Sequence, residues 1–228
     1  MLAGDPRGYR QHGHHVAGPD PPHVAAQKKS LIASERDEAA RQAWRDGLAA
    51  IAPQRFVFLD ETATPTTLTR LRARAPRGQR AIGRVPHKRW ESVTLLTSLT
   101  TTGMGAAMVL KGALARESFE AYVEQLLVPT LLPGQIVVLD NLPVHKSARA
   151  RRLIEGAGCR VLFLPAYSPD FNPIELAFAK LKQTLRSMAA RTFAGIVAAA
   201  APALDAITAP DARGFFAHCG YHLSGQLL

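Results

Sequence analysis

Short stretches of consecutive apolar residues mark the expected strands. Residues 55–61 (Arg-Phe-Val-Phe-Leu-Asp-Glu) and 135–140 (Gln-Ile-Val-Val-Leu-Asp) are apolar runs that end in acids, and residues 160–164 form a third run. Continuous hydrophobicity, unlike alternation, is typical of strands buried on both faces of a sheet that helices cover. Residues 92–101 and 106–111, joined by a Gly-containing turn, predict a hairpin.

Other segments predict helices, chiefly from apolar residues spaced three or four positions apart. The segments expected to be helical are 28–48, 117–132, 145–156, 172–190 and 194–207. The helix over 172–190 is strongly amphipathic, and its expected buried seam consists of Ile174, Phe178, Leu181, Leu185 and Met188. The stretch 62–89 contains several Pro and Gly breakers and is expected to be a loop.

The order of these elements predicts the fold class. A hairpin requires antiparallel pairing and strand-helix-strand units imply parallel pairing, so we expect an α/β fold with a mixed sheet flanked by helices on both faces. This order matches the ribonuclease H-like fold. We expect a disordered tail over residues 1–27, twelve of which are Gly, Pro or His, then a helical lead-in over 28–52 and a catalytic domain over 53–228.

Composition limits the classes of protein to which the chain can belong. Hydrophobic residues make up 47% of the 228 residues, which excludes a wholly disordered chain. The 28 Lys and Arg exceed the 18 Asp and Glu, and the net charge of +10 points to a polyanionic partner, either nucleic acid or an anionic membrane surface. The most apolar stretch, residues 193–207, is interrupted by Gly195, Pro202 and Asp205 and is too short to span a membrane. With two Cys and no secretory signal at its start, the sequence predicts a cytoplasmic protein.

Two acids, Asp60 and Asp140, each follow a predicted buried strand. Ligands in open α/β sheets bind beyond the carboxyl ends of the strands, so neighbouring strands would bring these carboxylates close together. Two adjacent like charges raise each other's pKa unless a cation neutralises them, and oxygen ligands suit Mg²⁺ or Mn²⁺. The alternative is that each Asp only begins a turn.

Glu175 is the third candidate acid. The sequence Asn172-Pro173-Ile174-Glu175 has the pattern of a capping box with Pro at the first helical position, so one reading is that Glu175 only caps its own helix. However, Glu175 also stands beside the apolar seam, with Lys182 and Arg186 following on its own face. One acid followed by two cations suits a phosphodiester strand laid across a metal site.

Basic residues that lack acidic neighbours are the candidate phosphate contacts. The stretch 62–89 contains eight Lys or Arg and no acid, and the helix over 145–156 is also basic. The candidate DNA-binding residues are Arg70, Arg72, Arg74, Arg77, Arg80, Lys88, Arg89, Lys146, Arg149, Lys182 and Arg186. The alternative is that these charges form only a solvated surface.

Three blocks of the sequence resemble the motifs of the DDE transposases. They are residues 59–62 (Leu-Asp-Glu-Thr), 139–145 (Leu-Asp-Asn, three residues, then His) and 168–175 (Ser-Pro-Asp-Phe-Asn-Pro-Ile-Glu). The 34 residues at positions 141–174 match the interval that the bacterial insertion-sequence branch of the mariner superfamily, the IS-six-thirty type, places between its second Asp and its Glu. The resemblance covers the chain from about Lys28 to Ser224.

The resemblance implies a role for each motif residue. Asp60, Asp140 and Glu175 would be the catalytic, metal-binding triad, with two Mg²⁺ or Mn²⁺ ions bridging the scissile phosphate. The residues expected to shape this site are Glu61, Asn141, His145, Asn172 and Pro173. The implied activity is hydrolysis at transposon ends followed by attack of the freed 3′-hydroxyl on target DNA, typically at a TA dinucleotide.

The resemblance also implies partners and a location. They are transposon-end and target DNA, a second copy of the chain in a homodimer, and a cytoplasmic, nucleoid-associated location in a bacterium. Family members usually carry an N-terminal helix-turn-helix region, and only some fifty residues precede Asp60, so we expect this region on a separate protein from an upstream reading frame. Two alternatives stay open: a truncated, inactive DNA-binding remnant, and another ribonuclease H-like nuclease. The intact triad disfavours the first, and the Asn-Pro-Ile-Glu block disfavours the second.

Overall fold

The computed structural model describes residues 33–48, 50–70, 73–83 and 90–222. The chain divides into units 1–32 and 33–228, and every described residue belongs to the second unit. The expected disordered tail over residues 1–27 therefore lies outside the described residues.

Six strands form one mixed sheet, in the order β3-β2-β1-β5-β6, with β4 also paired to β2. The strands are β1 (Phe56–Pro65), β2 (Ser92–Thr100), β3 (Gly103–Met104), β4 (Met108–Lys111), β5 (Ile136–Leu139) and β6 (Arg160–Phe163). The central strand β1 is antiparallel to β2 and parallel to β5, and β5 is parallel to β6. The expected mixed sheet is confirmed.

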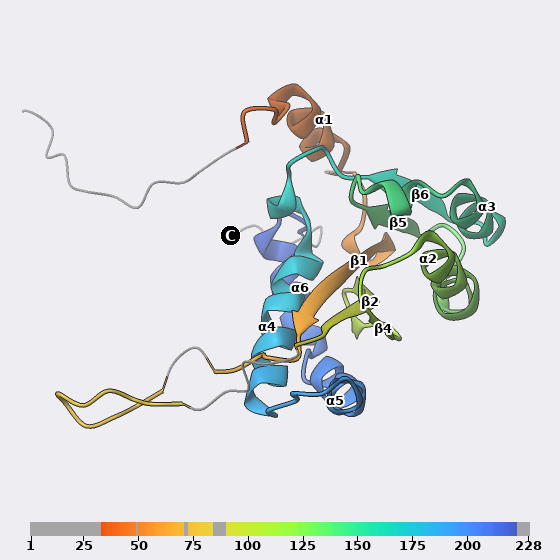
Figure 1. Ribbon diagram of the computed structural model, residues 1–228. Helices are drawn as coiled ribbons and strands as arrows, with labels where there is room; N and C mark the ends of the chain where they lie inside the picture. Colours follow the sequence, from red (N-terminus) through yellow and green to blue (C-terminus); the bar gives the residue numbers. More distant parts are fainter. Residues whose placement is uncertain (1–32, 49, 71–72, 84–89, 223–228) are drawn as a thin grey trace, which may run out of the picture. The chain divides into compact units, whose positions relative to one another are not determined.

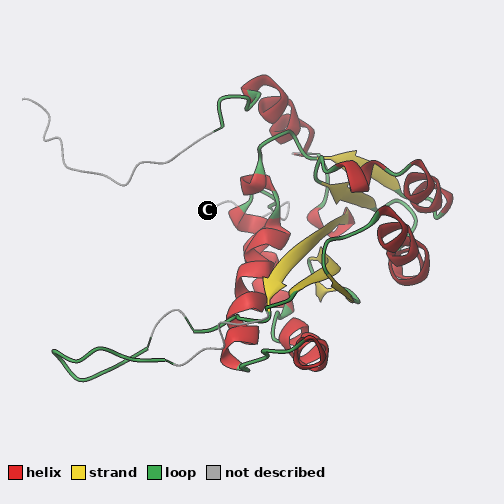
Figure 2. Cartoon of the chain, in the orientation of Figure 1, coloured by secondary structure: helices red, strands yellow, loops and turns green. Residues whose placement is uncertain are grey.

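Helices surround this sheet (Figure 2). They are α1 (Glu38–Leu48), α2 (Arg116–Tyr122), α3 (Ala148–Gly156), α4 (Pro173–Ser187), α5 (Phe193–Asp205) and α6 (Ala209–His218). Short 3-10 turns occupy Pro53–Arg55, Pro143–Lys146 and Pro169–Phe171. After α2 the chain continues as a π-turn over Val123–Leu127 and a 3-10 turn over Val128–Thr130, where Pro129 has no amide hydrogen to continue an α-helix.

Strands β1 and β5 are buried from both sides, as their continuous apolar runs predicted. The third predicted buried strand, β6, is only half-buried with an exposed first residue, because it lies at the edge of the sheet. Phe56 and Phe58 of β1 belong to a core formed with α4, α5 and α6, while Val57 and Leu59 belong to a second core formed with α2 and α3. Figure 1 shows these two groups of helices on opposite faces of the sheet. The ribonuclease H-like fold class is confirmed by this arrangement and by the comparison with solved structures reported below.

Several expected boundaries differ from the structure. Strand β1 runs four residues beyond Glu61, because residues up to Pro65 pair with β2, so the loop expected over 62–89 begins at Thr66. Met188, expected in the buried seam of α4, is 45% exposed because it is the C-cap residue of that helix. Helix α3 starts at Ala148 rather than at His145, since Ser147 caps it by accepting a hydrogen bond from the amide of Ala150.

The lead-in helix α1 is fastened to the loop that precedes α4. The Arg41 side chain is 1% exposed and donates hydrogen bonds to both carboxylate oxygens of Asp170, at 3.0 and 2.6 Å. Its guanidinium also lies 4.1 Å from the centre of the Phe171 ring. Nearby, Trp44 Nε1 donates to the Tyr221 hydroxyl, which itself donates to the Phe171 carbonyl. These contacts fix the start of the segment that leads to Glu175.

Within the described ranges, no single helix is long and apolar enough to cross a membrane. The pair α5 and α6 passes that test of length and composition only when the two are taken together, and it is bent by 80°. The buried residues of both helices belong to the core beneath the sheet.

Candidate active site

The sheet register places Asp60 and Asp140 on neighbouring strands. Phe58 of β1 pairs with Val138 of β5, so each acid lies two residues beyond this pair. Asp140 follows the last residue of β5, whereas Asp60 lies inside β1 because that strand continues along β2. The parallel pairing of β1 and β5 therefore brings together two acids that are 80 positions apart in the sequence.

Asp60 is the most buried of the three candidate acids, with 5% of its surface exposed. Its Oδ1 accepts a hydrogen bond from the backbone amide of Glu61 at 2.9 Å, and its Oδ2 accepts one from Asn172 Nδ2 at 2.7 Å. Burial, together with the negative charges of Asp140 and Glu61, raises the pKa of the Asp60 carboxyl to about 7. The site therefore opposes the ionised form of Asp60 until a positive charge arrives.

His145 is fully enclosed between two acids. Its Nδ1 lies 2.5 Å from Asp140 Oδ1, and its Nε2 lies 2.9 Å from Glu61 Oε2. Burial alone would lower the pKa of His145, but the two carboxylates raise it to about 9. The hydrogen bonds from His145 and from the Leu142 amide outweigh burial at Asp140 and hold the pKa of that carboxyl below its usual value. The raised pKa favours the positively charged form of His145, which offsets part of the negative charge of Asp140 and Glu61.

Asn172 departs from its expected role. The sequence predicts that its side chain caps α4, but no side-chain capping bond is present, and the amide group reaches Asp60 instead. The capping box between Asn172 and Glu175 is therefore a wrong prediction, because the buried carboxylate of Asp60 is the acceptor within reach of Asn172. Pro173 occupies the first turn of α4 as expected.

All three acids line one cavity of about 410 Å³. Glu175 enters it from the first turn of α4, and partial burial raises the pKa of its carboxyl, an effect that the charge of Lys182 opposes. Asn141 also lines the cavity and donates from Nδ2 to the Leu164 carbonyl at 2.6 Å, which joins the end of β5 to the segment that follows the neighbouring strand β6. Among the described residues that form the lining there is no Lys or Arg.

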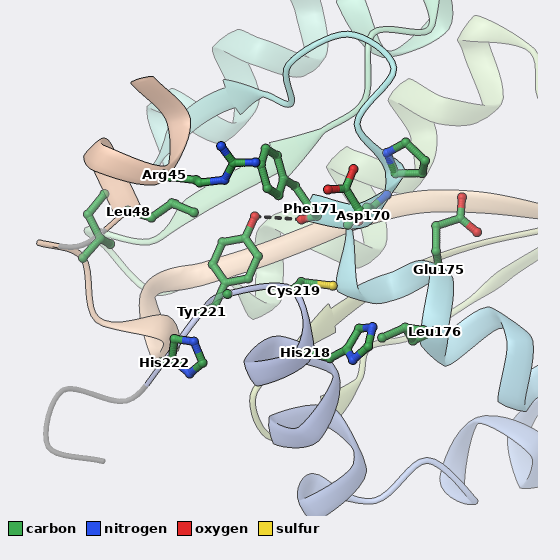
Figure 3. Close-up of a pocket in the computed structure, with 14 residues that line it drawn as sticks. Arg45, Leu48, Asp170, Phe171, Glu175, Leu176, His218, Cys219, Tyr221 and His222 are labelled. Carbon is green, nitrogen blue, oxygen red and sulfur yellow. Dashed lines mark hydrogen bonds between the residues drawn. The ribbon is translucent and has the colours of Figure 1, made fainter. Parts of the chain in front are cut away.

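A larger cavity of about 690 Å³ adjoins the first one (Figure 3). Pro169, Asn172 and Glu175 line both cavities, and most of the remaining lining comes from the α1 region, the Phe171 turn and the segment at the end of α6. Figure 3 shows the Tyr221 hydroxyl bonded to the Phe171 carbonyl in its wall. Because only one of the three acids reaches this larger space, the smaller cavity is the better candidate for acid-dependent chemistry.

The tightest group of potential metal-ligand atoms is a different set from the expected triad. Atoms of Asp60, Glu61 and His145 lie within 4.8 Å of one another. His145 Nδ1 is hydrogen-bonded to Asp140, whereas its Nε2 lies near Glu61 Oε2 and neither of these two buried atoms has a hydrogen-bond partner among the described residues. Sequence reasoning placed Glu61 and His145 near the site without giving them these contacts.

The candidate DNA-binding residues divide into three groups. Arg72, Lys88 and Arg89 lie outside the described residues. Among the candidates that the structure describes, those that are exposed or half-buried include Arg70, Arg74, Arg77, Arg80, Lys146, Lys182 and Arg186. Arg149, in contrast, is paired with Glu124 at 2.8 Å and Glu120 at 3.5 Å, which ties α3 to α2 and reduces its availability for phosphate.

Two further features of the site were missed by sequence reasoning. The Arg41 to Asp170 pair joins residues 129 positions apart, and no local pattern signals it. Tyr167 lines the acid cavity and has a backbone φ of 54°, a conformation that nothing in its sequence neighbourhood requires.

Comparison with solved structures identifies the fold. The Mos1 strand transfer complex superimposes with a TM-score of 0.66 at 18% identity and covers 87% of this chain and 64% of that chain. The Mos1 mariner paired end complex with Mn gives 0.62 at 16% identity, with 86% and 64% covered. The catalytic domain of Mos1 mariner transposase gives 0.59 at 15% identity, with 86% and 94% covered. The chain thus spans less than two thirds of the Mos1 chains in the two complexes, and it shares their fold.

Sequence comparison identifies the family. Among curated proteins, none matches this sequence. The sequence model of one family, described as DDE superfamily endonuclease, matches residues 55–194, and this segment includes Asp60, Asp140 and Glu175. Because the match spans more than half of the 228 residues, the chain belongs to the DDE superfamily endonucleases.

Proposed function

We propose that this chain is the catalytic part of a transposase of the IS-six-thirty type, which cleaves DNA at transposon ends and transfers the freed 3′ ends to target DNA. The observation behind this proposal is the convergence of Asp60, Asp140 and Glu175, from three distant segments, on one cavity. Membership of the DDE endonuclease family and the fold shared with Mos1 in its paired-end and strand-transfer complexes support it.

The donor set fits a divalent metal ion. Three carboxylates line a cavity to which the described residues contribute no Lys or Arg. Burial raises the pKa of the Asp60 carboxyl, so its ionised form is unfavourable without a nearby cation. A hard cation such as Mg²⁺ or Mn²⁺, which prefers carboxylate oxygens, relieves this repulsion. We assign Asp60, Asp140 and Glu175 as its ligands. Divalent ions held by these residues would supply activation of the attacking hydroxyl and stabilisation of the leaving oxygen.

The remaining residues orient these acids. Asn172 donates to one oxygen of Asp60, which fixes the rotation of that carboxylate toward the cavity. His145 is hydrogen-bonded to Asp140 through Nδ1 and lies next to Glu61 through Nε2. The hydrogen bond fixes the orientation of the Asp140 carboxylate before a metal ion binds. Asn141 joins the end of β5 to the segment after β6 by donating to the Leu164 carbonyl.

The DNA backbone is the proposed polyanionic ligand. The exposed cations of the loop after β1 follow Asp60 in the sequence, and the half-buried Lys182 and Arg186 follow Glu175 on α4. The net charge of +10 favours phosphate binding. A homodimer on DNA, a separate helix-turn-helix partner and a nucleoid-associated location remain predictions drawn from the family resemblance.

The proposal is tested by incubating the protein with the terminal inverted repeats of its own element and Mg²⁺ or Mn²⁺, and scoring strand nicking and joining. Asp60→Asn, Asp140→Asn and Glu175→Gln should each reduce cleavage by at least 10³-fold, because each removes a metal ligand. DNA affinity without metal should stay within a few-fold of the wild type.

Asp46→Asn is the matched control, because Asp46 is an exposed acid on α1 whose one hydrogen bond to a described residue is accepted from Gln42. It should cleave like the wild type. Normal cleavage by any variant of the three acids would remove that residue from the site. A wild-type protein that binds the ends but never nicks them would support the inactive remnant instead.

A further inference from the structure

Tyr167 has an unusual position in the wall of the acid cavity. It lines the same cavity as the three acids, and 58% of its surface is exposed. Its φ of 54° lies in the left-handed region, which bulky side chains rarely adopt. A large aromatic residue thus combines strained backbone with an exposed ring next to the proposed reaction centre.

The loop that holds Tyr167 is fixed on both sides. The Leu164 amide donates to the Leu139 carbonyl at 2.8 Å, and the Leu164 carbonyl accepts from Asn141. On the other side, the buried Ser168 donates from its hydroxyl to the Ala166 carbonyl at 3.1 Å. The position of Tyr167 is therefore set by the strand that carries Asp140 and by the segment that leads to Asn172.

Packing does not account for this arrangement. The Tyr167 hydroxyl makes no hydrogen bond to another described residue, and its ring belongs to neither apolar core. Strained residues persist where the surrounding structure holds them, and such positions cluster at sites of function. The exposed ring is thus a surface that a ligand can cover.

We propose that Tyr167 stacks on a nucleobase next to the phosphate that the acids bring to reaction. This inference rests on the proposed function, because it takes DNA as the ligand of the cavity. Every base offers an aromatic face, so stacking on a tyrosine ring positions a strand without selecting its sequence. The described lining contains no Lys or Arg that could hold a further phosphate beside the ring, which favours the base over the backbone as its contact.

The test uses end DNA with 2-aminopurine substituted in turn at each position around the scissile phosphate, in buffer without divalent metal so that no cleavage occurs. Stacking quenches the fluorescence of this base. Wild type and Tyr167→Phe should quench it at one position, whereas Tyr167→Asn should not, because Asn tolerates the left-handed backbone but has no ring. DNA affinity should fall by about 5- to 100-fold in Tyr167→Asn.

The outcomes separate this inference from the proposed function. Quenching by Tyr167→Asn equal to that of the wild type overturns the inference, and so does loss of quenching in Tyr167→Phe, which would assign the contact to the hydroxyl. A change in self-association of Tyr167→Asn without any change in DNA binding would assign the ring to a protein contact and also overturn it. If the wild type nicks end DNA with metal but quenches nowhere, only the inference fails, whereas failure to nick defeats the proposed function.

Discussion

The Asp60 carboxyl group is buried beside two further acids, and its ionised form is unfavourable without a cation. Because its pKa is raised to about 7 in the fold and is near 4 in the unfolded chain, ionisation at pH 8 opposes folding, by an amount on the order of a few kcal/mol. Asp60→Asn removes the charge and keeps one acceptor oxygen, so it loses one of the two hydrogen bonds that Asp60 accepts from the Glu61 amide and Asn172. We expect it to increase the free energy of unfolding at pH 8 in metal-free buffer by about 1–3 kcal/mol, measured by urea denaturation.

The pH dependence of this gain has a definite sign. The difference between Asp60→Asn and wild type should be largest above pH 7, shrink as the pH falls from 7 to 4, and vanish below pH 4, where the carboxyl is protonated in both states. Added Mg²⁺ should stabilise only the wild type, since binding to the native state raises its stability. A variant less stable than wild type at pH 8 without metal would contradict this account, and Asp46→Asn serves as the unaffected control.

At the scale of elements, helix α1 depends on one buried cation. Arg41 binds both oxygens of Asp170 and lies over the Phe171 ring, so its loss removes two charge-assisted hydrogen bonds and packing. We expect Arg41→Met to lower the free energy of unfolding by about 2–4 kcal/mol, measured by urea denaturation. Limited proteolysis should then cut within α1 before the rest of the described chain.

A double-mutant cycle separates the ion pair from general packing. If the pair is the cause, the loss in Arg41→Met combined with Asp170→Asn should be smaller than the sum of the single losses by about 1–3 kcal/mol. Strict additivity would show that the two residues act independently. Arg45→Met is the control, because the Arg45 guanidinium is exposed and lies farther from the Phe171 ring, at 5.2 Å.

Helix α6 begins at an electrostatic cap. Thr208 and Asp211 form a capping box, and Lys180 of α4 donates to Asp211 Oδ2 at 2.6 Å. The hydrogen bond from Lys180, together with those from Thr208, lowers the pKa of Asp211 to about 2. Because a lowered pKa stabilises the fold only while the carboxyl is ionised, this contribution is present above pH 4 and is lost as the pH falls through 2.

Asp211→Asn should therefore lower the Tm at pH 7, and its difference in Tm from the wild type should become much smaller as the pH falls toward 2, as measured by circular dichroism. Lys180→Gln should reproduce part of the loss at pH 7, because it removes the ion pair but leaves the hydrogen bonds between Thr208 and Asp211. The assignment is contradicted if the difference between Asp211→Asn and wild type is as large at pH 2 as at pH 7.

The sequence could predict the elements whose pattern is local. Continuous apolar runs predict the buried strands β1 and β5, and apolar residues spaced three or four positions apart predict α4. Helix α6 was not predicted, because only Ala212 and Phe216 are buried in it and Gly214 interrupts its pattern. Its capping box and early Pro were the available signal.

Contacts between distant segments were beyond the reach of local patterns. The side chain of Asn172 chooses between its own helix and Asp60, 112 positions away, and only the folded sheet decides that choice. The same holds for Arg41, a residue of ordinary helical appearance whose partner is Asp170. The three acids were predicted as a set because the motif spacing resembles a known family, and their roles still await the cleavage test.

At the scale of the whole molecule, the fold separates stability from the proposed chemistry. The two apolar cores lie on opposite faces of the sheet, and the acids lie where β5 ends, beside α4. Parallel pairing of β1 with β5 brings two acids together, and the Arg41 to Asp170 contact fixes the segment before the third. We therefore expect variants of the acids to lose activity without loss of fold, and variants of the cores to lose both.

The surplus of positive charge predicts how strongly salt weakens DNA binding. Each phosphate neutralised by the protein steepens the fall of log affinity with log salt concentration by about 0.9. Arg74, Arg77 and Arg80 are exposed in the loop after β1, so changing all three to Gln should make the slope shallower by about 2 to 3, measured by fluorescence anisotropy. Arg213→Gln, an exposed cation on α6, is the control and should leave the slope unchanged. An unchanged slope in the triple variant would mean that this loop is only a solvated surface, and the phosphate contacts would then have to come from other cations such as Lys182 and Arg186.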